Sequence, residues 1–309
     1  MIRTIVIVAA LLGVSSNTYA QTVAVTPAGQ ILISSEVIDT GKDKALRMTV
    51  PVMVNGQGPF QFVIDTGADR SVISRELAQR LGLKEDGTAT LHSIGGQSRV
   101  GIVKVDAMQV STNIIRNMRI AALPATNIGA DGLLGIDALK KQRIVMDFVA
   151  ETMVVEPSTA PEAAIAPDDN LIIVTARTRL GQLVMVDADA GGEPISVVVD
   201  TGAQNSIANA RLRNLLVKRV SGTTIKQIQL IDVLGRKTIA DYTIVSKLRI
   251  GGVGLGNAAI AFAEAHPFKL FGLSRKPAMF LGVETLRLFK RVSIDFATRK
   301  VKFLLPGER

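Results

Sequence analysis

The chain has 309 residues, of which 47% are hydrophobic, and a mean hydropathy of +0.31, so it is long enough for two domains with substantial cores. It has no Cys, two His and no Trp, which excludes disulfides, leaves a metal site poorly supplied with ligands and argues against stacked single-stranded nucleic acid. The net charge is +9, but the basic residues lie mainly in scattered pairs such as Lys140-Lys141. We expect a solvated basic surface and no nucleic-acid partner, with attraction to an anionic lipid or cell-wall polymer as the alternative.

The N-terminal 1–20 segment has the features of a secretory signal peptide. Arg3 supplies a positive charge, residues 4–14 are apolar, and Thr18-Tyr19-Ala20 places small residues at the −3 and −1 positions of a cut before Gln21. An uncleaved anchor is the alternative, but the apolar run is short for a bilayer span. We predict an exported protein, periplasmic or secreted, without an integral membrane span once the leader is removed.

The first half reads mostly as β structure. Strands are predicted over 45–67, where an Asn-Gly turn interrupts a partly alternating pattern. FVIDTGADRSVIS at 62–74 follows, and a short helix is predicted over 74–83, with Ser74 as its N-cap and Gly82 near its end. The motif thus lies where a strand turns toward a helix.

A proline-rich segment divides the chain into nearly equal parts. EPSTAPEAAIAPDDN at 156–170 contains three prolines, each of which lacks a backbone donor and disfavours helix. We predict an N-terminal lobe over 21–157, a linker over 158–170 and a C-terminal lobe over 171–309. Residues 21–45 could be a propeptide or an N-terminal strand.

The second half repeats the motif of the first. VVVDTGAQNSIAN at 197–209 matches the segment at 62–74, and 135 residues separate Asp65 from Asp200. In each copy an apolar run carries the Asp to a strand end, and the following Gly-Ala allows a tight turn. The sequence therefore predicts two similar strands that each end in a carboxylate.

A second repeated element supports internal duplication. GLLGIDALKKQRIVMDF at 132–148 matches MFLGVETLRLFKRVSIDF at 279–296, with Gly135 aligned to Gly282. Each copy runs from an apolar strand through the glycine into a short amphipathic helix. ANARLRNLLV at 208–217 is predicted to be the second-half counterpart of the earlier helix.

Other candidate motifs have simpler interpretations. A third Asp-Thr-Gly, Asp39-Thr40-Gly41, lacks the downstream glycine element and is predicted to be a surface turn. His92 and His266 are predicted to be isolated surface or loop histidines, and no G-x-S-x-G elbow supports Ser-His-Asp catalysis. GVGLGN at 252–257 fails the dinucleotide-binding pattern and is predicted to be a hairpin turn.

The repeated motifs resemble the retropepsin-like branch of the aspartic peptidases, which share the D-T-G-A consensus and the later apolar-apolar-Gly element. Two copies in one chain resemble the bilobal arrangement of pepsins. The resemblance implies an all-β, bilobal aspartic-protease fold, with two duplicated β-barrel-like lobes and short helices. It further implies a peptide or protein substrate, no cofactor, no metal and a chain competent as a monomer.

The resemblance assigns roles to particular residues. Asp65 and Asp200 would be the catalytic pair, one ionised and one protonated, as is known for the carboxylate dyad of aspartic proteases. Three further pairs would support the carboxylates. Thr66 and Thr201 would hydrogen-bond across the lobe interface, and Gly67 and Gly202 would present backbone N–H groups near the carboxylates. Gly135 and Gly282 would pack beneath the motif loops. Substrate contacts fall on the residue after each motif and on two hairpin tips: Asp69, Gln204, Ile94, Gly95, Gly96, Leu234 and Gly235.

The sequence differs from pepsins at two places, and the second difference leads to an expectation about pH. Neither hairpin, at 90–100 or at 230–239, has the Tyr found in pepsin flaps, although the first is expected to be a mobile flap rather than a plain solvent hairpin. Ala68 and Ala203 stand where pepsins commonly carry Ser or Thr. Without a hydroxyl donor to the ionised carboxylate, the dyad's apparent pKa values should be higher and the pH optimum nearer neutral.

The sequence thus predicts an exported aspartic endopeptidase that hydrolyses peptide bonds in extended segments. The alternative is a non-catalytic peptide-binding module that retains the fold. A second alternative is a dedicated enzyme that acts on one self-derived or partner substrate as a regulator.

Overall fold

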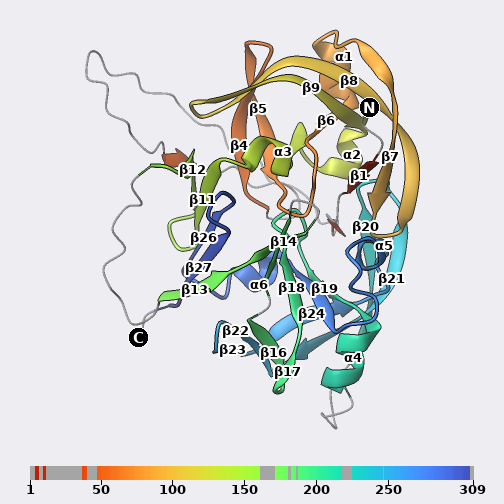
Figure 1. Cartoon of the computed structure of the whole chain (residues 1–309). Coiled ribbons are helices and arrows are strands. Elements are labelled where there is room, and N and C mark those ends of the chain that lie inside the picture. Colours follow the sequence, from red (N-terminus) through yellow and green to blue (C-terminus); the bar gives the residue numbers. More distant parts are fainter. Residues whose placement is uncertain are drawn as a thin grey trace.

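The computed structural model describes residues 4–6, 10–11, 37–39, 47–160, 171–179, 182–185, 187–217, 225–245 and 247–306. Most of these residues are in β strands, and the helices are short, which confirms the predicted all-β class. In Figure 1 the first half of the chain lies above the second half, and strands from both halves lie side by side between them. Within the described residues, no helix is long and apolar enough to cross a membrane.

The first half forms a closed six-stranded ring. Hydrogen-bonded neighbours run in the order β8-β4-β5-β10-β6-β9, and β9 pairs back with β8. This first-lobe sheet contains β4 (Thr49–Val54), β5 (Gln57–Ile64), β6 (Val72–Ser74), β7 (Glu85–Ser93), β8 (Gly96–Val110), β9 (Asn113–Leu123) and β10 (Gly132–Leu134). β7 extends the sheet as a hairpin with β8.

The second half repeats this topology without closing a ring among its described strands. Its main sheet runs β14-β15-β18-β25-β19-β24-β21-β20. These strands are β14 (Arg177–Arg179), β15 (Gln182–Met185), β18 (Ser196–Val199), β19 (Ser206–Ala208), β20 (Lys226–Asp232), β21 (Lys237–Val245), β24 (Ala258–Phe262) and β25 (Ala278–Leu281). A small sheet lies beside it, formed by β16 (Ala188–Ala190), β17 (Glu193–Pro194), β22 (Leu248–Ile250) and β23 (Val253–Leu255). The segment at 252–257, predicted to be a plain hairpin turn, therefore contains strand β23.

Equivalent strand pairs carry the two repeated motifs. β10 runs parallel to β5, with Leu133 opposite Val63, and β25 runs parallel to β18, with Phe280 opposite Val198. All four side chains are buried because each strand is covered on both faces, which explains the apolar runs before the motifs. Each pair fixes the direction in which the following Asp-Thr-Gly-Ala loop leaves the sheet.

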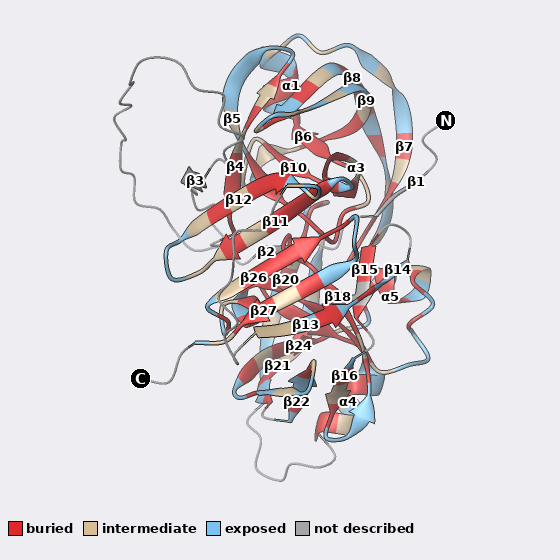
Figure 2. Ribbon diagram, turned by 60° about the vertical axis from the view of Figure 1, so that its left-hand side comes forward, coloured by how far each residue is buried: buried red, intermediate tan, exposed pale blue. Residues whose placement is uncertain are grey.

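A third sheet joins the two lobes. Its order is β13-β27-β26-β11-β12-β3, with β11 antiparallel to β26 across the chain duplication. The strands are β3 (Val37–Asp39), β11 (Gln142–Asp147), β12 (Thr152–Pro157), β13 (Leu171–Thr175), β26 (Arg291–Asp295) and β27 (Lys300–Leu304). One apolar core cluster includes residues from this sheet and from both lobes, and Figure 2 shows the buried strands that it connects. Asp39 of the third Asp-Thr-Gly ends strand β3, whereas Thr40 and Gly41 lie outside the described residues.

The helices fall largely where the sequence predicts them. α1 (Arg75–Arg80) begins after Ser74, whose Oγ accepts the N–H of Leu77, and α4 (Ala210–Val217) is its counterpart. The predicted amphipathic helices are α3 (Ile136–Leu139) and α6 (Val283–Leu286). The sequence interpretation missed α2 (Ala125–Ile128) and α5 (His266–Leu270), each too short for a helical period to show.

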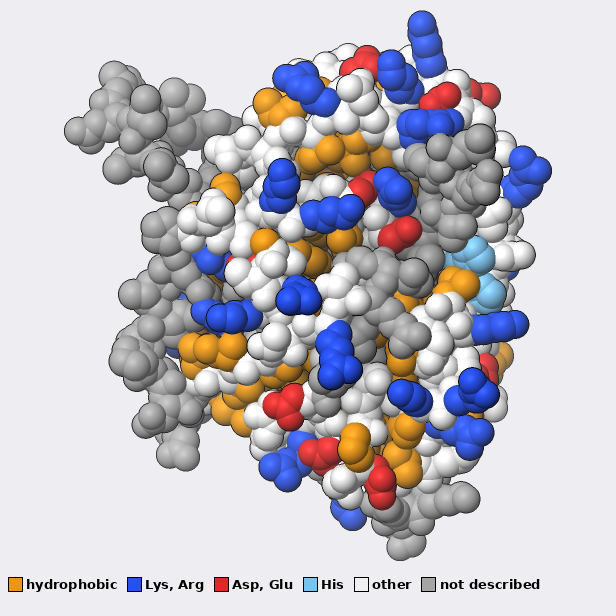
Figure 3. Space-filling view, in the orientation of Figure 1, with side chains coloured by type: hydrophobic (Ala, Val, Ile, Leu, Met, Phe, Trp, Pro, Cys, Tyr) orange, Lys and Arg blue, Asp and Glu red, His pale blue; other side chains and the backbone are white. Residues whose placement is uncertain are grey.

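Five residues of the predicted leader are described, and they form short strands. β1 (Thr4–Val6) pairs in parallel with β7, and β2 (Ala10–Leu11) pairs antiparallel with β20. The rest of the leader and most of the predicted linker lie outside the described residues. Lys and Arg side chains are spread over the face seen in Figure 3, with acidic groups among them.

Candidate active site

The two motif loops bring Asp65 and Asp200 together. Asp65 follows β5 and donates its N–H to Leu134 O (2.9 Å); Asp200 follows β18 and donates its N–H to Leu281 O (3.0 Å). Both aspartates are fully buried. The glycine of each loop faces the carboxylate of the other, since a Cβ on Gly67 would lie 2.5 Å from Asp200 Oδ1 and one on Gly202 would lie 2.2 Å from Asp65 Cγ. Only glycine allows this approach of the two loops.

The two threonines lock the loops together by a reciprocal exchange. Thr66 donates its N–H to Thr201 Oγ1 (3.1 Å), and Thr201 donates its N–H to Thr66 Oγ1 (3.0 Å). Each hydroxyl then donates to a carbonyl of the opposite lobe, Thr66 to Val199 O (2.8 Å) and Thr201 to Ile64 O (2.7 Å). Four hydrogen bonds between lobes fix the relative position of the carboxylates.

The later glycines support each loop from behind. Gly135 donates its N–H to Ser71 Oγ (3.1 Å), and Gly282 donates its N–H to Ser206 Oγ (3.0 Å). A Cβ on either glycine would lie within 2.5 Å of the backbone of the motif segment. Ser71 also donates to Asp137 Oδ1 (2.7 Å), and burial raises the pKa of Asp137.

Burial governs the electrostatics of the carboxylate pair. Burial raises the pKa of Asp65 to about 6, although Arg47 and then the N–H groups of Gly67 and Ala68 oppose the rise. Burial and then the charge of Asp65 raise the pKa of Asp200 well above its ordinary value. The pair therefore holds one proton at a pH between the two values.

In each carboxylate one oxygen accepts backbone hydrogen bonds and the other accepts none within the described residues. Asp65 Oδ1 accepts the N–H of Gly67 (2.9 Å), and Asp200 Oδ1 accepts those of Gly202 and Ala203 (3.1 Å each). Among the described residues, the Oδ2 atoms of both have no hydrogen-bonding partner, although both are buried. Two unpaired acceptors at adjacent, partly protonated carboxyls suit a reaction that needs one base and one acid.

The tip of each predicted flap hairpin packs into the opposite lobe. Ile94, at the tip of the β7–β8 hairpin, is buried in a second-lobe cluster that includes Phe268. Val233, at the tip of the β20–β21 hairpin, is buried in a first-lobe cluster that includes Leu91. The first hairpin is therefore not the plain solvent hairpin weighed as an alternative.

A carboxylate joins the two tips. Asp232 accepts the hydroxyl of Ser93 (2.6 Å) and the N–H of Gly95 (3.0 Å), and Arg236 donates to Gly95 O (3.3 Å) and Gln97 O (2.7 Å). The remaining predicted contact residues are partly or fully accessible neighbours of the loops or tips, namely Asp69, Gln204, Gly96, Leu234 and Gly235. Gly235 lies near the Asn127 side chain of α2.

The prediction of two isolated histidines is wrong. His92 Nδ1 lies 2.9 Å from His266 Nε2, and the rings stack with centroids 5.1 Å apart. The two residues lie 174 positions apart in the sequence, and the hairpin tip meets α5 of the other lobe only in the folded protein, so no local pattern predicts the contact. Burial, with smaller contributions from neighbouring charges, lowers the pKa of both rings.

Two buried side chains next to the motif loops were missed from the sequence. Arg47 Nη1 donates to Gly202 O (3.0 Å), and Gln182 Nε2 donates to Gly67 O. Both are fully buried. The signal was available, since 135 residues separate Arg47 from Gln182 as they separate the two aspartates.

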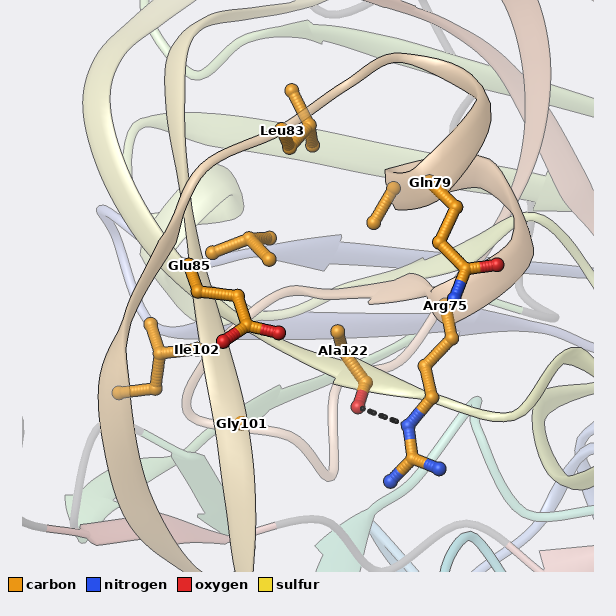
Figure 4. A pocket seen from close by; sticks show the side chains of 9 residues that line it. Arg75, Gln79, Leu83, Glu85, Gly101, Ile102 and Ala122 are labelled. Atoms are coloured by element: carbon orange, nitrogen blue, oxygen red, sulfur yellow. Dashed lines mark hydrogen bonds between the residues drawn. The ribbon is translucent and has the colours of Figure 1, made fainter.

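A cavity of about 290 Å³ lies elsewhere, between α1 and the β7–β8 hairpin, and Figure 4 shows its lining. Arg75 in that lining donates to Ala122 O (3.3 Å), and no motif residue contributes to it. No group of three or more His, Asp or Glu side chains that could hold a metal occurs within the described part of the chain.

Comparison with known families agrees with this geometry. A family model described as aspartyl protease matches residues 50–138 and 186–285, together more than half of the chain. The chain belongs to the aspartyl protease family. Each matched region contains one motif loop and its supporting glycine, so this aspartyl protease carries the family unit twice, in two lobes. No curated protein matched the chain in a search.

Proposed function

We propose that this aspartyl protease is an exported endopeptidase, active as a monomer, that hydrolyses peptide bonds in extended segments. The observation that carries the proposal is the pair of buried carboxylates, Asp65 and Asp200, held by one loop from each lobe. Family membership supports protease chemistry in general. The composition of residues 1–20 supports export, and the supply of one motif by each lobe supports a monomer.

The reaction follows from the protonation state of the pair. The ionised member removes a proton from a water molecule as its oxygen attacks the scissile carbonyl carbon, and the protonated member donates to the carbonyl oxygen. The tetrahedral intermediate then collapses: the carboxyl that took the proton from water donates it to the leaving nitrogen, the C–N bond breaks, and a hydroxyl of the intermediate returns its proton to the other carboxylate. One water is consumed, and the dyad again holds one proton.

The hairpins supply a means of holding an extended peptide. β1 adds to the edge of β7 and β2 adds to the edge of β20, so both hairpins accept backbone pairing from a separate strand. Backbone pairing of this kind binds many side-chain sequences. We therefore propose peptide or protein substrates bound as an added strand.

Cleavage of a peptide library tests the proposal. The wild-type protein should cut peptides within their length, and Asp65→Asn and Asp200→Asn should each lower cleavage by at least ~10³-fold while unfolding at a temperature close to the wild type. In each variant one carboxyl group remains, and a lone carboxyl cannot act as both base and acid. Binding without cleavage by the wild type would favour a peptide-binding module, and cleavage confined to its own chain or one partner would favour a dedicated enzyme.

Export and cleavage of the leader have a separate test. N-terminal sequencing of the extracytoplasmic protein should begin at Gln21. Recovery of the full-length chain from the cytoplasm alone would contradict export and leave the peptidase proposal standing.

A further inference from the structure

We infer that Arg47 decides which member of the dyad is ionised, making Asp65 the base and Asp200 the acid. This inference deepens the proposed function, because it assigns the two roles that the proposed reaction requires. It concerns a positioning residue, since Arg47 acts through the two carboxylates.

Arg47 and Gln182 occupy equivalent places in the two lobes. Arg47 lies just before β4 and donates from Nη1 to Gly202 O (3.0 Å) and from Nη2 to Ile128 O. Gln182 begins β15 and donates to Gly67 O. Each residue therefore holds the motif glycine of the opposite lobe, and both precede the regions matched by the family model. The fold is duplicated here, but the charge is not.

The contact places the charge on the side of Asp65. Gly202, which Arg47 binds, is the glycine that faces Asp65; Gly67, which Gln182 binds, faces Asp200. A cation therefore holds the glycine that faces Asp65, and a neutral amide holds the glycine that faces Asp200. An opposite charge favours the ionised form of its neighbour.

Charge balance favours the same assignment. A guanidinium stays protonated even when fully buried, as Arg47 is, and an uncompensated buried charge is strongly destabilising. A dyad with one proton carries one negative charge, which balances Arg47. Of the groups that lower the pKa of Asp65, Arg47 has the largest effect, whereas the N–H groups of Ala203 and Gly202 lower the pKa of Asp200 more than Arg47 does.

Other charged groups near the loops have their own partners. Asp137 of α3 accepts the hydroxyl of Ser71, with Arg70 nearby, and Glu284 of α6 accepts the Asn205 side-chain amide (2.8 Å). Asp69 follows the first loop, where the second lobe has the neutral Gln204. Arg47 is the positive group that acts on both carboxylates.

The direct test is a carboxyl-carbon NMR titration of protein labelled at its Asp side chains. The Asp65→Asn and Asp200→Asn variants identify the two resonances. In the wild type, Asp65 should ionise at the lower pH. In Arg47→Gln, which makes the lobes alike, the pKa of Asp65 should rise by about 1–3 units and approach that of Asp200.

A charge swap makes the test reciprocal. In Arg47→Gln/Gln182→Arg the cation moves to the other lobe, so Asp200 should become the group that ionises first. If the Arg47→Gln variant does not fold, Gln182→Arg alone should lower the pKa of Asp200. Unchanged titrations in folded variants would overturn the inference.

The pH profile of kcat/KM gives a second readout that a purely structural role would not move. Arg47→Gln should shift the acidic limb upward by about 1–3 pH units, because the base then ionises only at higher pH, and Arg47→Lys should restore it. An equal loss of activity at every pH would mark Arg47 as structural. If the titrations give the expected result but the wild type cleaves no peptide, the proposed function is contradicted and the assignment of charge to Asp65 stands.

Discussion

The two lobes have nearly the same geometry at the dyad and different chemistry around it. The motif loops exchange matched hydrogen bonds through Thr66 and Thr201, within 0.1 Å of each other in length. Next to the loops, the first lobe has Arg47 at the position where the second lobe has Gln182. The motif therefore fixes where the carboxylates lie, and the residues outside it decide how each behaves.

The largest effect is expected from substitutions that prevent the close approach of the two loops. Alanine at Gly67 or Gly202 would place a Cβ against the opposite aspartate, so each change should lower kcat/KM by at least ~10²-fold. Gly101→Ala is a matched control in open space and should leave cleavage unchanged. Full activity of either motif variant would show that the loops do not meet as described.

The second test measures the symmetry of the threonine exchange. Thr66→Ala and Thr201→Ala should each lower the free energy of unfolding by about 1–3 kcal/mol, and by similar amounts, because each leaves a buried N–H of the other lobe unpaired. The Thr→Ser variants keep the hydroxyls and should lose much less. Chemical denaturation measures both. A much larger loss of unfolding free energy in one alanine variant than in the other would show that the two threonines do not contribute equally.

The third test adds a hydroxyl to both lobes. Ala68→Ser/Ala203→Ser supplies a donor to the ionised carboxylate, which lowers its pKa and should move the kcat/KM profile toward acid by about one pH unit. The raised pKa values of both aspartates support a wild-type optimum nearer neutral. An unchanged profile would show that other groups govern the dyad.

The smallest effect is expected from the histidine pair, which joins the first-lobe hairpin to α5 of the second lobe. Because burial lowers the pKa of His92 and His266 in the folded protein, their contribution to stability is present above about pH 6.5 and lost as the pH falls through the lowered values. Lys269 and Arg236 lie close enough to oppose protonation of His266.

Hydrogen exchange measures this effect at the hairpin tip. Exchange at Gly95, whose N–H bonds to Asp232, should speed up in mild acid as the histidine contact weakens. His92→Phe/His266→Phe keeps stacked rings without a titratable group and should lose this acid dependence. The same acceleration in the variant would place the sensitivity elsewhere.

Much of the fold was predictable because duplication doubles every local signal. The apolar runs before Asp65 and Asp200, the Ser74 cap and the repeated glycines each occur in a pattern that fixes strand, turn or helix. The roles predicted for Thr66 and Thr201 agree with the observed exchange of hydrogen bonds between the lobes.

The rest depends on contacts between distant segments. The histidine pair forms only when a hairpin of one lobe reaches α5 of the other, and no local pattern encodes that distance. Arg47 gave no local signal either, since a single Arg before a strand usually lies on the surface. Only the 135-residue offset, applied beyond the motif, could have paired it with Gln182.

The most direct measurement is peptide cleavage by Asp65→Asn and Asp200→Asn, alone and mixed in equal amounts, beside the wild type over a range of concentrations. If each chain supplies both carboxylates, wild-type activity rises in proportion to concentration and the mixture stays as inactive as either variant. Activity restored by mixing, or rising with the square of concentration, would contradict a dyad built by two lobes of one chain.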